Sequence, residues 1–346
     1  MLKIGSKIDE IRIDGSLEAL RRDLRHYVAI EMEAAEIPVH GLDVIKNGFL
    51  DRDRMEEVRR ILGGVDLEYS VHAPNPLNLM EQESPELHLS VFRASLAFAA
   101  AIGAKVLVYH AGRFIPEETF PVAKDPRLSK EDASLWMERE REYLARLSEE
   151  YPDILICIEN ARPYLHYSPY CYAEAIDHLK EQVETVNRPN VKINLDVGHL
   201  YMASRFYQFD PVQAVKNIQS LIAHTHIHDN FGGAVYPHEK TQTHQIPFGR
   251  GDGHMPVGWG GIPLAEILSA YIPPYEGMLM MELRSRYFSR TEESGANLVR
   301  LLESLPIQPD AIGRTSVNKP RWAGSLRPID AGQAPPIEPE KRRNLS

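Results

Sequence analysis

Short runs of apolar and β-branched residues alternate along this chain with longer segments in which apolar residues recur every three or four positions. The short runs predict strands, because buried parallel strands are nearly continuous hydrophobic stretches. They lie at residues 2–8, 27–32, 67–73, 105–111, 154–160, 191–197, 222–228 and 278–283. The longer segments predict helices. These lie at residues 16–26, 52–62, 84–103, 129–150, 173–186, 210–222 and 262–270.

The alternation of the two patterns predicts the fold. Strands that alternate with helices form parallel βαβ units, and eight such units close a (β/α)8 TIM barrel. A doubly wound open sheet is the structural alternative, but it would need a glycine-rich phosphate turn after an early strand. The sequence has no GxGxxG, no Walker lysine loop and no GxSxG motif. We therefore expect an α/β protein with a single TIM barrel over residues 1–304.

The hydrophobic pattern stops near the C-terminal end of the sequence. Residues 305–346 are rich in proline and have no hydrophobic period. This composition predicts an extended tail that is either disordered or wrapped over the barrel.

Composition narrows the class of function. The formal net charge of −10 disfavours binding to duplex DNA, since lysine and arginine contacts to phosphates supply most non-specific affinity. Two cysteines give no disulfide framework, and no apolar run is long enough to span a membrane. The first residues lack the pattern of a secretory signal. We expect a cytoplasmic enzyme that acts on a small molecule, and a homo-oligomer is compatible with these features.

Six consecutive predicted strands end in, or are followed by, side chains that bind metals. In a TIM barrel the carboxyl ends of the strands and the loops after them hold the active site. Taken singly, each residue has a structural explanation, such as a hydrogen-bonded histidine or an aspartate in a turn. Their convergence on one barrel mouth predicts a metal site, and mixed imidazole and carboxylate ligands suit Zn or Mn. The predicted ligands are His72, His110, Glu159, Asp196, His199, His226, Asp252, His254 and Glu282.

The motifs around these residues resemble a known superfamily. In order they are VHAPNPLNL, VYHAG, IEN, LDVGH, HIHD, D-x-H-x-x-x-G-x-G-x-I and MEL. This series is similar to the xylose isomerase-like TIM-barrel superfamily and, in its ligand pattern, closest to the endonuclease IV family. The resemblance covers roughly residues 65–285.

The resemblance implies three metal ions. One ion would take His72 and His110, and a second would take Asp196, His226 and Glu282, with Glu159 bridging the two. A third would take His199, Asp252 and His254. Four carboxylates contribute −4 and three divalent ions +6, which leaves a site of about +2 that suits an anionic substrate. The resemblance therefore implies hydrolysis of a phosphoester in a small or single-stranded substrate, with Glu159, Glu282 and His199 as catalytic residues.

Other polar residues are candidates for binding a phosphoester or sugar phosphate. The predicted substrate-binding residues are Arg162, His228, Lys240, Arg250 and Arg284. A solvated loop or a surface ion pair explains the charged members equally well, and His228 could instead orient a metal ligand. The chain lacks the basic and aromatic loops with which the endonuclease family grips bent DNA, which again disfavours duplex DNA as the substrate.

Sugar isomerases and epimerases of the same superfamily provide the alternative. They hold one metal ion with two glutamates, an aspartate and a histidine, which here would be Glu159, Glu282, Asp196 and His226. The carboxylates would then also move a proton at the carbon next to a carbonyl, and His199 would contact a substrate hydroxyl. The number of ions separates the two enzyme hypotheses. A metal-dependent binding protein without catalysis is a third class.

Overall fold

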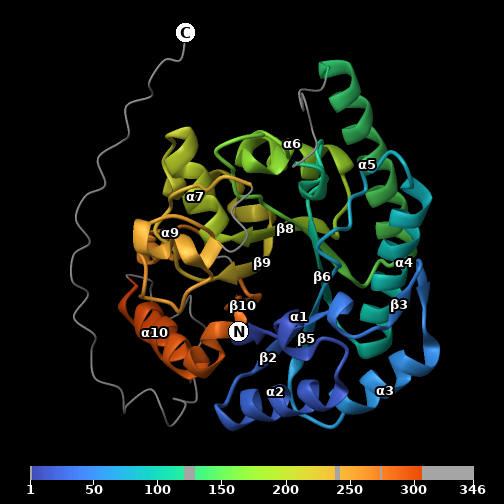
Figure 1. The fold of residues 1–346 in the computed structure, drawn as a ribbon, viewed down its shortest axis with the longest axis vertical. Coiled ribbons are helices and arrows are strands. Elements are labelled where there is room, and N and C mark those ends of the chain that lie inside the picture. Colours follow the sequence, from blue (N-terminus) through green and yellow to red (C-terminus); the bar gives the residue numbers. More distant parts are fainter. Residues whose placement is uncertain (1, 121–128, 238–241, 273–274, 306–346) are drawn as a thin grey trace.

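Eight parallel strands close into a barrel at the centre of the molecule (Figure 1). The structure is a computed structural model that describes residues 2–120, 129–237, 242–272 and 275–305. Around the barrel the strand order is β1-β10-β9-β8-β7-β6-β5-β2, so the predicted TIM barrel is confirmed. The strands are β1 (Lys3–Lys7), β2 (Ala34–Pro38), β5 (Glu68–His72), β6 (Val106–His110), β7 (Leu155–Glu159), β8 (Val191–Asp196), β9 (Ile222–Ile227) and β10 (Met278–Met281).

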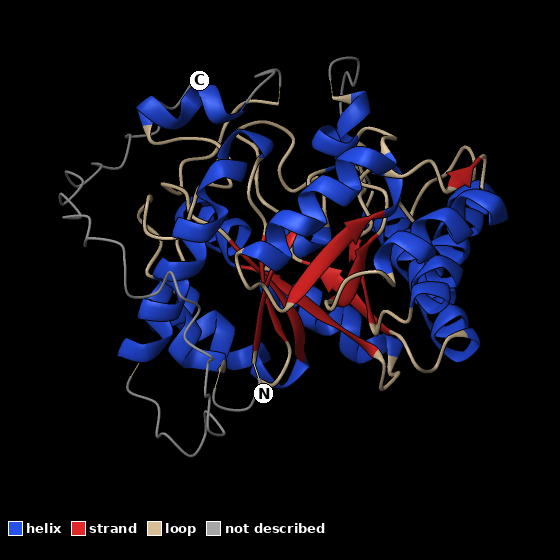
Figure 2. Ribbon diagram, turned by 90° about the horizontal axis from the view of Figure 1, so that it is seen from below, coloured by secondary structure: helices blue, strands red, loops and turns tan. Residues whose placement is uncertain are grey.

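Helices surround the strands, as Figure 2 shows. They are α1 (Glu10–Ile13), α2 (Leu17–Ala29), α3 (Arg52–Leu62), α4 (Pro85–Ile102), α5 (Lys130–Glu150), α6 (Ile176–Val186), α7 (Val197–Tyr207), α8 (Pro211–Ile218), α9 (Leu264–Tyr271) and α10 (Thr291–Ser304). Of these, α1, α7 and α10 were not predicted. A small antiparallel hairpin of β3 (Ile45–Lys46) and β4 (Phe49–Leu50) lies outside the barrel. No helix in the described ranges is long and apolar enough to cross a membrane.

The predicted second strand, residues 27–32, is wrong. Helix α2 continues to Ala29 because Leu20, Leu24 and Tyr27, spaced as on one helical face, are all buried. The strand comes later, at Ala34–Pro38, where it pairs with β1 and β5. Its sequence, AAEIP, has two alanines and a glutamate in place of the branched residues that mark the other strands.

Side-chain alternation along the strands directs the polar residues into the barrel. Successive side chains on a strand point to opposite faces. Val106, Val108 and Cys157 form a small apolar cluster of their own, separate from the main core between strands and helices. His110 continues the row of Val106 and Val108, and Glu159 continues the row of Cys157. Both polar side chains therefore lie on the inner face, at the carboxyl end of the barrel.

Nearly all of the predicted C-terminal tail lies outside the part of the chain that the structure describes. Leu305 is buried at the end of α10, and residues 306–346 lie outside the described residues. The division into a barrel and a tail therefore stays a prediction.

Candidate metal centre

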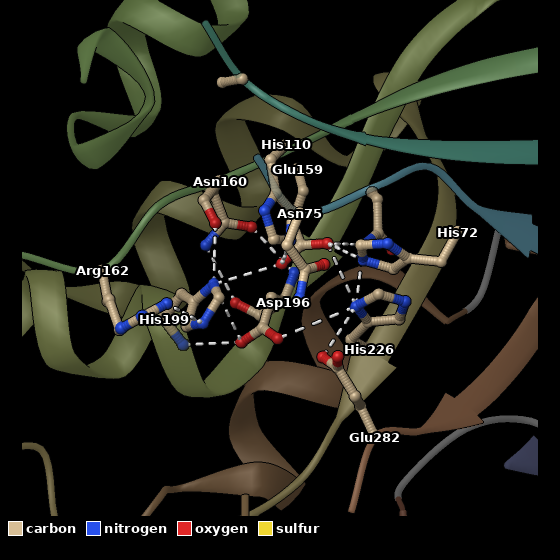
Figure 3. Close-up of polar contacts among 12 residues, drawn as sticks. His72, Asn75, His110, Glu159, Asn160, Arg162, Asp196, His199, His226 and Glu282 are labelled. Atoms are coloured by element: carbon tan, nitrogen blue, oxygen red, sulfur yellow. Dashed lines mark hydrogen bonds and ion pairs between the residues drawn. The ribbon is translucent and has the colours of Figure 1, made fainter. Parts of the chain in front are cut away.

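Most of the predicted ligands, among them His72, Glu159 and Glu282, meet at the carboxyl ends of the strands in Figure 3. Strand pairing places these residues at the same height along the barrel axis, because His110 lies opposite Glu159 and Asp196 lies opposite His226. Glu282 directly follows the last residue of β10. The parallel register thus brings side chains from distant parts of the sequence to one end of the barrel.

The central group contains three carboxylates and one imidazole. Ligand atoms of Glu159, Asp196, His226 and Glu282 all lie within 4.8 Å of one another. The Nδ1 atom of His226 is 3.2 Å from Glu159 Oε2 and 3.1 Å from Glu282 Oε2. Ionised carboxylate oxygens accept hydrogen bonds and cannot donate them, so a hydrogen on Nδ1 or a metal ion between these atoms stabilises this arrangement. The donor set fits a divalent cation.

The electrostatics of the group point the same way. Burial alone raises the pKa of a carboxyl group, yet the charge of His226 and the hydrogen bonds from His199 and His226 hold the pKa of Glu159 well below its usual range. Burial lowers the pKa of an imidazole, yet nearby carboxylates, with Glu36 and Glu282 foremost, raise the pKa of His226 well above its usual value. The buried carboxylates therefore stay ionised and attract positive charge.

A second group adjoins the first through Glu159. It consists of His72, His110 and Glu159. The Nδ1 atom of His72 lies 2.7 Å from the Ala73 carbonyl oxygen, to which it can donate, while its buried Nε2 atom has no hydrogen-bond partner. Burial lowers the pKa of His110 to about 3, so this imidazole is neutral. Both rings could bind a metal or a substrate hydroxyl.

A third group lies on the other side of the centre. It consists of His199, His228, Asp252 and His254. The Nε2 atom of His254 is 2.7 Å from Asp252 Oδ2, and that of His199 is 3.3 Å from the same oxygen. The three groups together contain all nine predicted metal ligands, and the structure adds His228 to the third group.

Cationic side chains already accompany two of the carboxylates. Lys7 Nζ lies 2.7 Å from Glu282 Oε1, and this lysine is buried. Arg162 Nε is 3.6 Å and Arg284 Nη2 is 3.8 Å from Asp252 Oδ2. Lysine and arginine side chains therefore supply positive charge beside both Glu282 and Asp252.

The glycine-rich loop at 249–262 places Asp252 and His254. Gly251 has φ +92°, and a Cβ atom there would lie 2.4 Å from the Gln242 carbonyl oxygen. Only glycine fits this backbone without strain. His254 itself has φ 42°, in the left-handed region that side chains rarely adopt. The loop thus turns sharply enough for both side chains to point into the barrel mouth, where they are buried.

Asp229 stabilises the second half of that loop. Its carboxylate accepts hydrogen bonds from the backbone N–H groups of Asn230, Gly258 and Ile262. A Cβ atom on Gly260 would lie 2.3 Å from Asp229 Oδ1, so this glycine allows the close approach. Asp229 therefore has a structural role in holding the loop that presents His254.

A cavity of about 170 Å³ opens beside the metal-ligand groups. Its charged lining consists of Lys7, Asp9, Glu10, Arg113, Glu117, Glu118, Glu159, Arg162, Asp252, Glu282 and Arg284. His110, His199 and His254 also line it. Acidic residues outnumber basic ones in this wall.

Only some of the predicted substrate-binding residues line the cavity. Arg162 and Arg284 line the cavity. His228 is fully buried outside the lining, with Nε2 3.1 Å from Asp196 Oδ1, which agrees with the alternative that it orients a ligand. Arg250 donates to Gln245 Oε1 and is not part of the lining. Lys240 lies outside the described residues.

Comparison with known proteins identifies the family. The family described as the xylose isomerase-like TIM barrel matches residues 24–305 of this chain. The chain belongs to this family. None of the curated proteins matches it.

Solved structures with the same fold include several sugar epimerases. A D-tagatose 3-epimerase-like protein is 22% identical, with 87% of this chain and 97% of that chain covered and a TM-score of 0.63. L-ribulose 3-epimerase is 12% identical, with 91% and 99% covered and a TM-score of 0.64. D-psicose 3-epimerase from Clostridium cellulolyticum H10, solved with D-tagatose, is 15% identical, with 88% and 99% covered and a TM-score of 0.63. At these identities the likeness concerns the fold.

Several polar residues around the centre of this xylose isomerase-like chain were not predicted from the sequence. Glu36 was missed because the second strand was misplaced. Lys7 lies near the end of the first predicted strand, residues 2–8, and is the last residue of β1, so its position was a signal that could have been used. Asn160 binds the Asp196 backbone through both amide atoms, and Asn194 donates to Glu159 Oε2. These contacts hold the carboxylates in place and depend on neighbours that only the fold brings together.

Proposed function

We propose that this protein is a metal-dependent isomerase or epimerase of a small sugar. A single divalent ion, Zn or Mn, would be held by Glu159, Asp196, His226 and Glu282, which offer the hard oxygen donors and one imidazole that such ions bind. Such an ion, when bound, polarises the carbonyl and the neighbouring hydroxyl of a sugar. The earlier expectation of a three-ion phosphoester hydrolase is the competing hypothesis.

The observation that carries this proposal is the pairing of Asp252 with arginines. Two guanidinium groups, those of Arg162 and Arg284, lie 3.6 and 3.8 Å from Asp252 Oδ2. An ion bound to Asp252 would lie beside both of them. Like charges at such distances repel by several kcal/mol, on the order of 4 at an effective dielectric constant of about 20. The arginines thus supply the positive charge that a further ion would bring.

Lys7 has the same effect on the central group. The three carboxylates of that group contribute −3, a divalent ion contributes +2, and the Lys7 ammonium beside Glu282 contributes the remaining positive charge. These three carboxylates, Lys7 and one ion together are neutral, although Lys7 Nζ also lies 3.4 Å from Glu10 Oε2. A second ion close by would add positive charge to these groups.

Glu159 and Glu282 both line the cavity and are the candidates for proton transfer. A carboxylate next to a bound sugar can remove a proton from the carbon beside the carbonyl. Return of a proton to the opposite face of that carbon inverts it and gives an epimer. Return to the neighbouring carbon interconverts a ketose and an aldose.

The cavity also supports an uncharged substrate. Lys7 faces Glu282, and Arg162 and Arg284 face Asp252, so these cations already have carboxylate partners. The three similar structures described above are a D-tagatose 3-epimerase-like protein, L-ribulose 3-epimerase and D-psicose 3-epimerase, all named for ketoses. A small polyhydroxy ketone fits this evidence better than the phosphoester or sugar phosphate expected from the sequence.

Proton exchange at carbon tests the proposal directly. The manganese-loaded protein is incubated with ketoses and aldoses in D2O, and NMR follows deuterium entering the carbon next to the carbonyl. We expect exchange and a new sugar with at least one substrate, and a loss of at least about 100-fold in the E159Q variant. Metal-dependent cleavage of a phosphodiester, with no exchange in any sugar, would contradict the proposal.

A further inference from the structure

A fully buried glutamate lies behind the metal-ligand groups, on the inner side of β2. Glu36 Oε1 is 2.9 Å from His226 Nε2, and Glu36 Oε2 is 2.9 Å from His224 Nε2. The Ser70 hydroxyl donates to the same Oε2 atom at 2.9 Å. None of these four side chains is exposed to solvent. Three donors thus converge on one carboxylate in the interior of the barrel.

We propose that Glu36 is a positioning residue of the metal centre, which holds the His226 ring with Nε2 protonated and Nδ1 turned to the ion. This inference rests on the proposed metal site. A carboxylate only accepts hydrogen bonds, so the ring nitrogen beside it carries the hydrogen. When an ion takes the place of the proton on Nδ1, the imidazole is left with a single N–H on Nε2, and Nδ1 directs its lone pair to the cation.

The other neighbours of the His226 ring are consistent with this orientation. The Asn194 amide nitrogen, which can only donate, lies 3.2 Å from His226 Nδ1. The His72 ring stacks on the His226 ring with centroids 5.7 Å apart and planes at 14°. The rotation of the His226 ring is thus fixed by three neighbours, which are Glu36 at Nε2, Asn194 at Nδ1 and His72 against the ring face.

The barrel topology makes this contact long-range. In the strand order, β10 and β1 lie between β9, which carries His226, and β2, which carries Glu36. The hydrogen bond therefore crosses the interior and ties the ligand to β2, which carries none of the four proposed ligands. His224 and Ser70 supply the further donors that a buried carboxylate needs to remain stable in a dry interior.

A carboxylate on the far nitrogen also strengthens a metal-bound imidazole. It raises the basicity of the ligand nitrogen, and loss of such a partner typically weakens metal binding about 10- to 100-fold. Gln at position 36 keeps the size but places an N–H donor where an acceptor is needed. One of the two imidazoles must then change its tautomer or lose its hydrogen bond.

The experiment measures the affinity of the full chain for Mn²⁺ by competition with a chelator. E36Q should bind Mn²⁺ about 10- to 100-fold more weakly than the unmodified protein. S70A is the matched control, since it removes a Glu36 donor without touching His226, and it should bind within about threefold of the unmodified protein. Thermal unfolding with chelator in excess separates a general loss of stability from a loss of metal binding. Unchanged Mn²⁺ affinity in E36Q would overturn the inference.

A second measurement needs no variant. In the zinc-loaded protein, ¹⁵N NMR of the histidines should show His226 with a hydrogen on Nε2 and metal on Nδ1. The opposite tautomer would overturn the inference even if E36Q fails to fold. If the unmodified protein binds no ion at all, the proposed function fails first, and that outcome is distinct from either result for Glu36.

Discussion

His226 and His254 are both buried histidines beside carboxylates, but their neighbours give them different chemistry. His226 Nδ1 faces two carboxylate oxygens, and its other nitrogen is bound by Glu36. His254 Nδ1 lies 2.9 Å from the Glu282 backbone oxygen, to which it can donate, and its Nε2 atom faces the arginine-paired Asp252. The first histidine fits a metal ligand, and the second fits a wall of the substrate cavity.

Substitution of each histidine by alanine should separate these roles. We expect H226A to lose most of its bound metal, because the central group then has no imidazole donor. H254A should keep the metal content of the unmodified protein, while its activity falls about 10-fold or more through loss of a cavity wall. Elemental analysis after gel filtration measures both variants. Loss of one of several ions in H254A would instead favour the three-ion hydrolase.

The polar residues at the strand ends were predictable from the sequence, since ligand side chains there follow clear hydrophobic runs. Their partners were not. Glu36 lies in a strand whose alanines hide it, and its contact with His226 joins residues 190 positions apart. The arginine pairing of Asp252 likewise depends on the fold, because Arg162 and Arg284 come from different loops. In the proposed function, the arginine contacts of Asp252 favour one ion over three.

At the scale of elements, the loops after the strands determine what the barrel presents. Asp252 and His254 were predicted to converge with the other ligands on the barrel mouth, and the buried positions of both side chains agree with this. The strand pattern predicted most of the barrel, but α7 was missed because it begins immediately after β8 with no intervening loop. Asp196 ends the strand and also caps that helix by accepting from the His199 backbone N–H at 2.7 Å.

Two glycines of the loop provide a matched test of its shape. G251A places a Cβ at φ +92° and 2.4 Å from a carbonyl oxygen, so it should destabilise the protein by about 1–3 kcal/mol and displace Asp252. G261A should change little, because the nearest atom to its Cβ is 3.9 Å away. Urea unfolding and activity assays measure the difference. Equal behaviour of the two variants would show that the loop is not held as described.

The loop between β7 and α6 contains a titratable anchor. Glu174, in a short 3₁₀ helix (Tyr172–Glu174), accepts hydrogen bonds from the Tyr170 and Cys171 N–H groups and from the Tyr207 hydroxyl. Burial raises the pKa of Glu174 to about 7, from an ordinary value of 4.5. The folded protein therefore holds this proton more tightly than the unfolded chain does.

This linkage predicts a pH dependence of stability. Because the folded pKa is the higher one, the contribution of Glu174 is fully present below about pH 4.5 and is lost as the pH rises towards about 7. The loss amounts to roughly 3 kcal/mol. Urea unfolding at several pH values should show that E174Q lacks this part of the slope. Parallel curves for E174Q and the unmodified protein would contradict the assignment.

At the scale of the whole molecule, the closed barrel concentrates negative charge at one end. Ligand atoms of Glu159, Asp196 and Glu282 lie within 4.8 Å of one another. The repulsion between these carboxylates destabilises the folded protein when no cation is bound. Metal binding should therefore stabilise the fold. With the free ion at about 100 times its dissociation constant, we expect a gain of about 2.7 kcal/mol, seen as a higher melting temperature that chelator reverses. An identical melting temperature with and without chelator would argue against a metal site in the folded protein.

The number of ions per chain tests the central claim most directly. Elemental analysis of the protein, purified with excess zinc or manganese and freed of loosely bound ions, should give one ion per chain. Removal of the Asp252 carboxylate in D252N should leave that number unchanged, because its arginine partners occupy the place of a further ion. Two or three tightly bound ions per chain, with one lost in D252N, would contradict the single-metal isomerase and support the hydrolase.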